Sequence, residues 1–593
     1  MESNCDLDLD PNKDDLPLQA NTNHMLVRHY VLDLSTSKGR SLEAALFCFW
    51  SLVWVPANRE MMSVLWGDES EEFTLFSNEK SIFLPSHTHT TISRICCDAT
   101  TLSFRCCVYT MGSPINNRAL FPCQEPPVAM STWQARERAP CDYTVLTSGE
   151  NQAFPKPAET GFLQWDYYVT MPMPASTFTI AVGQWLEAGV KDPNFEQYVC
   201  ANMDYPCCFM VSAARAQTVI PHRVFAPPCH LQKANDMVLP LLPLCLTAAH
   251  SILCVHPFSR LDVLIVPSGF SSLGMASPHV MFLSQSKLTG ERNLCGARLC
   301  HEIAHSWFGL AIGARDWTEE WISEGFATYL EDVFWSHVQK LSCREVEEQR
   351  QLKALLRWRR LSDELQNSEE ELQVLRPNKE NTGEVSESGA SVVKHALNPE
   401  KPFMQVHYLK GYFLLKFLAD QVGEEKFLHF FKVFVGKFHG QLIPSQVSLS
   451  CTGDVCSFSI TLETIFSDWL DTPEMPKWPR DACSEWLRTP AVQEVKGEVA
   501  KWIHFSGPGG KGSKRKRAGP KVNFKEVRPR QVKHHWCELA VKYKHTAAMG
   551  VYLYGELMVQ EDARQQALAR RCLSIIKDDM DQSARSVVEE MIL

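Results

Sequence analysis

The feature that most constrains this 593-residue chain is a His-Glu-x-x-His sequence followed at a set distance by a third candidate ligand. The sequence comprises His301, Glu302 and His305, and Glu324 follows His305 after 18 intervening residues. Four residues along a helix turn about 400°, so the two imidazoles lie on one face about 6 Å apart and can bind one ion. Two histidines and one carboxylate leave the fourth position of a tetrahedral zinc ion to water. The pattern therefore predicts a helix that carries a zinc site.

The glutamate between the two histidines lies beside the predicted ligands without joining them. A carboxylate in this position can accept a proton from a water molecule that zinc has made acidic. We therefore interpret His301, His305 and Glu324 as the ligands of one Zn²⁺ and Glu302 as a general base. The alternative is two core histidines and a salt-bridged glutamate, and this alternative leaves the spacing and setting of Glu324 unexplained.

The chain is too long for a single core and predicts a multidomain α+β protein. Short β-type runs broken by turn residues predict an antiparallel β domain over residues 1–224. Helical periods dominate residues 225–470, the predicted catalytic domain, although the apolar run 261–267 predicts a strand at the edge of its cleft. Residues 471–593 begin with prolines and a basic run and resume as helix, which predicts a linker followed by a helical C-terminal domain.

Two helices are expected to carry the metal site. The first should extend from about residue 293 to about residue 309. The second should start near Trp317, with Asp316 or Thr318 as its N-cap, and should contain Glu324. Acidic residues in the first turn of this second helix suit the positive end of its dipole.

Two further stretches of the predicted catalytic domain are unusual in composition. Residues 343–400 form a charged insertion with a helical pattern over 345–375, which we expect to be a surface excursion. The apolar run 237–255 is nearly long enough to cross a bilayer, but it contains Pro240 and Pro243. We interpret that run as a buried core helix, so no membrane association is expected.

The net charge, the N-terminal residues and one basic run indicate the binding partners and the cellular location to expect. A net charge of −10 disfavours a nucleic-acid-binding protein, which usually carries a basic excess. The acidic N-terminal residues lack the pattern of a secretory signal, so we do not expect secretion. The run 511–517 contains Lys-Arg-Lys-Arg and predicts import into the nucleus or nucleolus, with the cytoplasm as a second location. A solvated linker is the alternative interpretation of this basic run.

Peptide hydrolysis passes through a tetrahedral oxyanion, so a second donor facing the zinc would assist. Tyr408, in the sequence Val-His-Tyr-Leu-Lys-Gly, is the candidate donor. A phenol is neutral at pH 7 and donates a strong hydrogen bond to an alkoxide. From the residue alone, an ordinary core or rim aromatic is the more common interpretation of Tyr408, and only the resemblance described next favours the donor.

The sequence resembles the zinc aminopeptidases that include aminopeptidase B and the bifunctional leukotriene hydrolase. The resemblance is carried by HEIAHSWFG, WISEGFATYLE and VHYLKG, and by the segments 118–126 and 273–278. It implies a saddle-like β domain, a thermolysin-like catalytic domain and a helical C-terminal domain. It also places Tyr408 at the family's transition-state tyrosine and implies that Gly274 and Met275 contact the peptide.

The residues that recognise the free amine in such enzymes are missing from their usual positions. Relatives carry Gly-Met-Glu-Asn at the cleft, whereas this chain has Ala276 and Ser277 in place of the last two residues. The position that usually adds Gln or Glu aligns near Ser113. A buried ammonium without a carboxylate partner is costly. Glu319 and Glu320 are acids that could substitute.

The expected function is that of a zinc metalloaminopeptidase that hydrolyses the N-terminal residue of peptides through a zinc-activated water. The expected partners are peptides, and nucleic acid is not expected as a substrate. A second hypothesis is a zinc-binding nuclear interaction protein with weak or no peptidase activity, which the absence of an acid at Ala276 motivates. A third, hydrolysis of a lipid epoxide, would use the same zinc, but no sequence feature indicates a long apolar channel.

Overall fold

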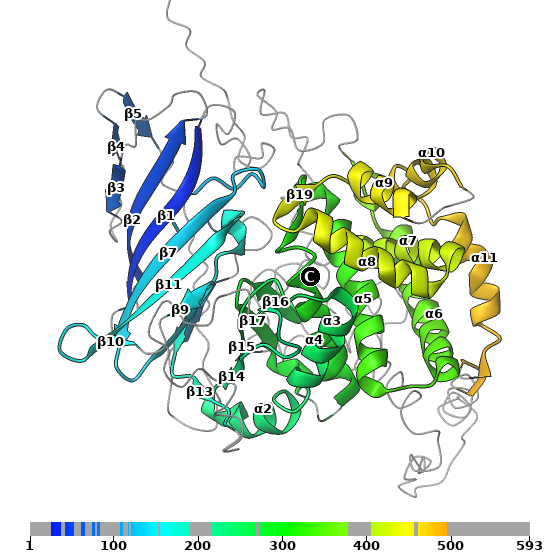
Figure 1. The fold of residues 1–593 in the computed structure, drawn as a ribbon, viewed down its shortest axis with the longest axis horizontal. Coiled ribbons are helices and arrows are strands. Elements are labelled where there is room, and N and C mark those ends of the chain that lie inside the picture. Colours follow the sequence, from blue (N-terminus) through cyan, green and yellow to red (C-terminus); the bar gives the residue numbers. More distant parts are fainter. Residues whose placement is uncertain are drawn as a thin grey trace, which may run out of the picture.

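The computed structural model has a β-rich N-terminal part beside a larger, mainly helical part, with a small sheet between them (Figure 1). This mixed α+β architecture agrees with the fold class expected from the sequence. The structure describes residues 25–36, 42–52, 61–65, 74–77, 80–83, 107–110, 117, 120–121, 123–151, 155–189, 215–267, 270, 272–288, 290, 292–377, 405–455, 460–490 and 492–494. Ser113 and the basic run 511–517 lie outside the described residues.

The N-terminal part is built on a sheet with the strand order β10-β11-β7-β1-β2-β3, in which β9 also pairs with β11. Alternate residues of β7 are buried, and Trp133 packs there with Tyr30 and Tyr167 in one apolar cluster. The strands are β1 (Met25–Thr36), β2 (Leu42–Leu52), β3 (Met61–Leu65), β7 (Ser131–Pro140), β9 (Glu150–Asn151), β10 (Lys156–Pro157) and β11 (Phe162–Met173).

The prediction of a purely antiparallel N-terminal domain is wrong in one respect. β1 and β7 pair in parallel, with Tyr30 opposite Trp133, while the neighbouring pairs β1 with β2 and β7 with β11 are antiparallel. About 100 residues separate these two strands, so local sequence patterns carry no information about their relative direction. The remaining N-terminal strands form a three-stranded sheet and a separate pair: β6 (Cys107–Tyr109), β12 (Ile180–Gly183) and β8 (Thr144–Thr147), and β4 (Thr74–Ser77) with β5 (Lys80–Phe83).

A five-stranded sheet lies between the two parts, in the order β13-β14-β15-β17-β16. The run predicted as a strand forms β15 (Leu261–Val266), which is buried at every position, as expected for a strand covered on both faces. The edge strand β16 (Gly274–Ser277) runs beside the first metal-site helix, so it borders the candidate site. The other strands are β13 (Leu186–Glu187), β14 (His222–Ala226) and β17 (Val280–Ser284).

The helical part surrounds one large apolar cluster to which most of its helices contribute. Two short strands, β18 (Ile312–Ala314) and β19 (Gln441–Ile443), pair in parallel within it. The helices are α2 (Leu231–Met237), α3 (Leu242–Leu253), α4 (Arg292–His305), α5 (Trp321–Gln339), α6 (Cys343–Asn367), α7 (Val406–Val422), α8 (Glu424–Phe438), α9 (Ser445–Val455), α10 (Leu462–Ile465) and α11 (Lys477–Trp486).

The apolar run 237–255 forms α3 and its flanks, and α3 packs into the core through Leu242, Cys245 and Leu246. This burial confirms the interpretation of the run as a core helix. Among the described residues, no single helix is long and apolar enough to cross a membrane. Two consecutive helical segments, 228–237 and 242–253, reach that length and apolar character only when they are counted as one, and the chain bends by 50° between them.

The helix expected at the start of the charged insertion is α6, but it is not a surface excursion. Leu352, Leu355 and Leu361 lie in the large apolar cluster, and α6 packs against α7 and α11. Its N-terminus carries a complete capping box between Ser342 and Glu345. The charged residues misled the prediction because several of them, including Lys353, are buried in ion pairs with α5.

Helices α5 and α7 approach closely where two glycines face each other. A Cβ atom added to Gly325 would lie 2.9 Å from the Cα atom of Gly411, and a Cβ added to Gly411 would lie equally close to Gly325. Backbone atoms cannot rotate out of the way as a flexible side chain can. The contact therefore fixes α7 against the helix that carries Glu324.

We predict that Gly325→Ala destabilises the protein by about 1–3 kcal/mol, because the added methyl group must separate two packed helices. Gly436→Ala on α8 is the matched control, since nothing lies within 4 Å of its added Cβ. The control should leave stability unchanged or raise it by up to about 1 kcal/mol, because alanine favours a helix over glycine. Urea unfolding of both variants measures the difference, and equal stabilities would contradict this account of the helix contact.

Candidate metal centre

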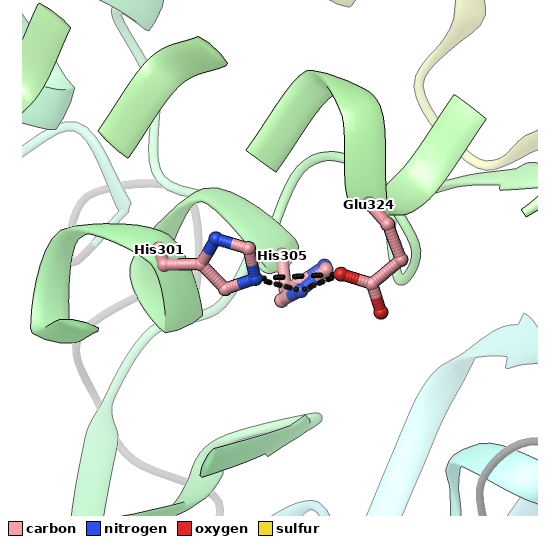
Figure 2. Close-up of side chains that lie close together, drawn as sticks. All are labelled: His301, His305 and Glu324. Atoms are coloured by element: carbon pink, nitrogen blue, oxygen red, sulfur yellow. Dashed lines mark hydrogen bonds and ion pairs between the residues drawn. The ribbon is translucent and has the colours of Figure 1, made fainter. Parts of the chain in front are cut away.

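Three side chains from α4 and α5 bring their ligand atoms together, as Figure 2 shows. His301 Nε2 lies 3.1 Å from His305 Nε2, and Glu324 Oε2 lies 3.3 Å from the first nitrogen and 3.2 Å from the second. Among the described residues, this is the only group of at least three His, Cys, Asp or Glu side chains whose ligand atoms all lie within 4.8 Å of one another. The three residues expected to bind a metal are therefore adjacent.

The dimensions of this triangle fit a zinc ion. Zinc bonds to imidazole nitrogen and carboxylate oxygen are about 2.0–2.2 Å long, so tetrahedral geometry places neighbouring ligand atoms about 3.3 Å apart. The three observed separations of 3.1, 3.2 and 3.3 Å are close to that value. Glu324 Oε2 is also buried and, among the described residues, has no hydrogen bond of good geometry. An ion between the three atoms would satisfy all of them.

The second nitrogen of each histidine lies near an oxygen, with hydrogen-bond geometry for His305 and at ion-pair distance only for His301. His305 Nδ1 lies 3.0 Å from the carbonyl oxygen of Phe308, and His301 Nδ1 lies 3.3 Å from Glu331 Oε2. A proton on Nδ1 in each ring leaves the Nε2 lone pair free for a metal. Glu331 in turn pairs with Arg357 of α6, at 3.5 Å. The site thus includes a helix that sequence patterns assigned to the surface.

The local sequence explains where the two site helices begin and end. Helix α4 ends at His305, before the predicted end at residue 309, and Gly309 then turns the chain with a φ of 117°. The second helix was expected to start near Trp317, but residues 317–319 form a separate 3₁₀ turn, and it is this turn that Asp316 caps by accepting a hydrogen bond from the Thr318 amide. Helix α5 follows, and its first residue, Trp321, donates from Nε1 to the Ser445 hydroxyl.

Electrostatics among the three side chains favour a charged pair. Burial disfavours protonation of His305, but the charge and hydrogen bond of Glu324, the charge of Glu302 and the Phe308 carbonyl together outweigh burial and raise the pKa of His305 to about 9. Burial alone would raise the pKa of the Glu324 carboxyl, but the charges and hydrogen bonds of His305 and His301 together lower it well below its usual range. The site therefore favours an anionic oxygen beside a cation, and a metal ion would replace the proton.

Glu302 points its carboxylate at the edge strand β16. A Cβ added to Gly274 would lie 2.2 Å from Glu302 Oε1, so only glycine leaves room for the carboxylate. Met275 follows on the same strand and is partly buried. The strand thus places Gly274 beside the candidate base, whereas Met275 packs against the apolar cluster that includes Phe270 and Phe282.

Tyr408 lies on α7 and faces the metal ligands. Its ring stacks on His301 with ring centroids 6.1 Å apart and an angle of 18° between the planes. Burial, and secondarily the negative charge of Glu324, raises the pKa of the phenol well above its ordinary value. Tyr408 therefore keeps its proton at neutral pH and can act as a donor.

Glu319 and Glu320, the two acids that could substitute for the missing amine-binding glutamate, have different surroundings in the structure. Glu319 is fully buried, and its Oε2 accepts a hydrogen bond from the Ser445 amide at 2.9 Å, so it faces the protein interior. Glu320 retains 23% exposure of its side chain and lies 3.6 Å from His407 Nε2. His407 precedes Tyr408 on α7, so this contact lies next to the candidate oxyanion donor, and the charge of Glu320 also contributes to raising the pKa of Tyr408.

Ala276 packs against the apolar cluster of the N-terminal part, and Ser277 is buried. Neither residue offers a carboxylate at this edge of the site.

Sequence reasoning missed two charged residues of the site. Glu331 lies seven residues after Glu324 on the same helix, and a helical spacing of seven places both on one face. Arg298 lies four residues before Glu302, and its Nη1 is 3.3 Å from Glu302 Oε1. Both spacings were visible in the sequence, but their partners became specific only once α4, α5 and α6 were packed together.

The chain has sequence relatives among curated peptidases. Residues 245–457 match the family model described as the peptidase family M1 domain. Aminopeptidase O of Rattus norvegicus is 52% identical over 82% of this chain and 68% of that protein. Aminopeptidase O of Homo sapiens is 52% identical over 83% of this chain and 68% of that protein. Aminopeptidase B of Rattus norvegicus is 25% identical over 63% of this chain and 51% of its own length.

Solved structures share the fold at low sequence identity. Yeast LTA4 hydrolase in complex with bestatin superposes with a TM-score of 0.59 and 16% identity, over 100% of this chain and 88% of that one. The M1 zinc metallopeptidase from Deinococcus radiodurans gives a TM-score of 0.51 and 17% identity, over 77% of this chain and 95% of that one. The mixed α+β architecture is therefore that of LTA4 hydrolase and the M1 zinc peptidases.

We predict that Glu319 makes stability depend on pH. Burial, opposed in part by the hydrogen bond from Ser445, raises its pKa from 4.5 to about 7. The folded state therefore holds a proton that the unfolded state releases, so stability is greatest below pH 4.5 and falls as pH rises through 7. Chemical unfolding measures this effect. Between pH 4.5 and pH 7.5, the free energy of unfolding of wild type should fall by on the order of 3 kcal/mol relative to that of Glu319→Gln.

The control for this pH series is Glu425→Gln, which removes an exposed glutamate from the first turn of α8. If Glu319→Gln and Glu425→Gln give parallel pH profiles, Glu319 does not bind a proton on folding in this range.

Proposed function

The chain belongs to peptidase family M1, and from this premise we propose that it is a zinc-dependent aminopeptidase that removes the N-terminal residue of peptides. The observation that carries the proposal is the triangle of His301, His305 and Glu324 with the Glu302 carboxylate beside it. The two aminopeptidase O relatives and aminopeptidase B support an aminopeptidase over other hydrolases. The dimensions of the triangle support zinc as the metal.

His301, His305 and Glu324 would hold the ion. When bound, Zn²⁺ would lower the pKa of a coordinated water and polarise the peptide carbonyl. Glu302 would accept the proton of the attacking water and return it to the departing amine, which is the work of a general base and then a general acid. Tyr408, kept protonated by its burial, would donate a hydrogen bond to the oxyanion as the tetrahedral intermediate forms.

We assign the substrate's free amine to Glu320. This residue precedes Glu324 by one helical turn, retains exposure and lies near Tyr408. Glu319 is buried in another contact, and Ala276 offers no carboxylate at the edge strand. A carboxylate near the site would stabilise the ammonium group, which is costly to bury without a partner.

The finer organisation and the cellular location are part of the proposal. We divide the chain into a β domain (1–224), a thermolysin-like catalytic domain (225–470) and a helical C-terminal domain (471–593). We also propose that the run 511–517 directs the protein to the nucleus or nucleolus, with the cytoplasm as a second location. The sequence of the run supports this location through its four consecutive basic residues.

One observation favours a second candidate function, a zinc-binding nuclear interaction protein with weak or no peptidase activity. Ala276 makes an apolar contact at the strand position where relatives carry an acid. The two candidates differ in turnover. Release of fluorophore from a panel of aminoacyl-coumarins, with and without chelator, distinguishes them, and an absence of chelator-sensitive release on every member would favour the interaction protein.

We predict that Glu302→Gln retains one zinc ion per chain but abolishes peptide hydrolysis, because the amide can occupy the same space without accepting a proton. Glu324→Ala should lose both the metal and the activity, because it removes one of three ligands. Elemental analysis and coumarin release measure the two properties separately. Full activity in Glu302→Gln would refute the proposed mechanism.

We predict that the enzyme cleaves free peptides and spares N-acetylated copies of the same library, as read by mass spectrometry. Glu320→Gln should raise KM for free peptides by about tenfold or more, since a charged hydrogen bond contributes about 1.5–3 kcal/mol. Equal cleavage of free and acetylated peptides would contradict the aminopeptidase assignment while leaving a metallopeptidase in place. An unchanged KM in Glu320→Gln would reject only the role of Glu320.

A further inference from the structure

Arg298 places a positive charge within the candidate site. It lies on α4 one turn before Glu302, and its Nη1 donates to Glu302 Oε1 at 3.3 Å. Its guanidinium is largely buried, with 21% of the side chain exposed, while only 2% of the Glu302 side chain is exposed. Its positive charge also acts to lower the pKa of Tyr408 on α7, against the larger effect of burial. Arg298 therefore brings a largely buried positive charge onto the carboxylate of the candidate base.

The same oxygen of Glu302 is confined from another direction. A Cβ at Gly274 would lie 2.2 Å from Oε1 and 2.4 Å from the carboxyl carbon, so the carboxylate packs directly on the β16 backbone. Within the described part of the chain, the contact with Arg298 is the only hydrogen bond that the carboxylate makes. Oε1 is thus engaged by Arg298 and β16, and Oε2 remains available.

We propose that Arg298 is a positioning residue that holds Glu302 Oε1 so that Oε2 is presented to the reacting water. The inference rests on the proposed peptidase function and adds a residue to it. A glutamate side chain has several rotatable bonds, and leaving it unrestrained would spread the base over several positions. A misplacement of about 1 Å in a catalytic group can cost about 10²-fold in rate.

Arginine suits this role better than lysine. Its guanidinium is planar, remains charged and offers several N–H donors in a fixed arrangement, whereas an ammonium group is a mobile point charge. A charged hydrogen bond to a carboxylate is also about twice as strong as a neutral one. The four-residue spacing alone would be an ordinary helix-stabilising pair, and the chain contains such a pair elsewhere, between Arg344 and Glu348 at 2.9 Å.

The kinetic test uses the full-length protein with aminoacyl-coumarins and elemental analysis. Arg298→Ala should lower kcat by about 10–100-fold while KM stays within about threefold and zinc content is unchanged. Millimolar guanidinium should restore part of the lost kcat, and Arg298→Lys should retain an intermediate rate. Arg344→Ala, which breaks the matched pair on α6, should keep wild-type kcat and show no response to guanidinium. If Arg298→Ala fails to fold, Arg298→Met keeps the apolar stem and provides the same measurement.

A second readout does not depend on turnover. Crystal structures should show one Glu302 conformer in wild type and several, or a rotated one, in Arg298→Ala. An Arg298→Ala variant with wild-type kcat and an unmoved Glu302 would overturn the proposal, as would a loss of kcat that guanidinium does not restore. Absence of chelator-sensitive activity in wild type would reject the peptidase function instead, and the Glu302 conformer would still decide whether Arg298 positions that side chain.

Discussion

The contact between α4 and α5 is the constraint on which the rest of the structure depends. It brings two imidazole nitrogens and one carboxylate oxygen to within 3.1–3.3 Å of one another. Three polar groups this close, and largely buried, are stable only if a proton or a metal lies among them. The surrounding helices hold this arrangement: α6 reaches His301 through Arg357 and Glu331, and Ser445 of α9 anchors the start of α5.

Close backbone approaches provide the room that the site needs. At Gly325 and Gly411 two helices meet without side chains between them, which brings Tyr408 of α7 over His301. At Gly274 the edge strand leaves space for the Glu302 carboxylate. These glycines act by absence of a Cβ atom, so their importance is a matter of packing rather than of chemistry. A larger residue at any of them would displace a functional side chain.

Local spacing was sufficient to predict the two helices of the candidate metal centre and the strand β15, because each depends on residues close together in the chain. The structure also brings His301, His305 and Glu324 together, and their role as metal ligands stays a prediction. Local spacing was insufficient for features that depend on residues far apart in the chain. The parallel pairing of β1 with β7 joins segments about 100 residues apart, and the burial of α6 depends on Lys353 and Arg357 meeting acids of α5. The many charged residues of α6 indicated an exposed helix, whereas Lys353 and Arg357 are buried in ion pairs with α5. Arg298 was missed for the same reason, since its role depends on Gly274 from another segment.

The central claim is that the preformed triangle binds zinc. X-ray absorption at the zinc edge, on full-length protein purified without added metal, tests it most directly. The account predicts one zinc per chain, with a first shell of nitrogen and oxygen at about 2.0–2.1 Å that includes two imidazoles. A first shell dominated by sulfur at about 2.3 Å, or protein that is folded and binds no zinc when the metal is supplied, would contradict it.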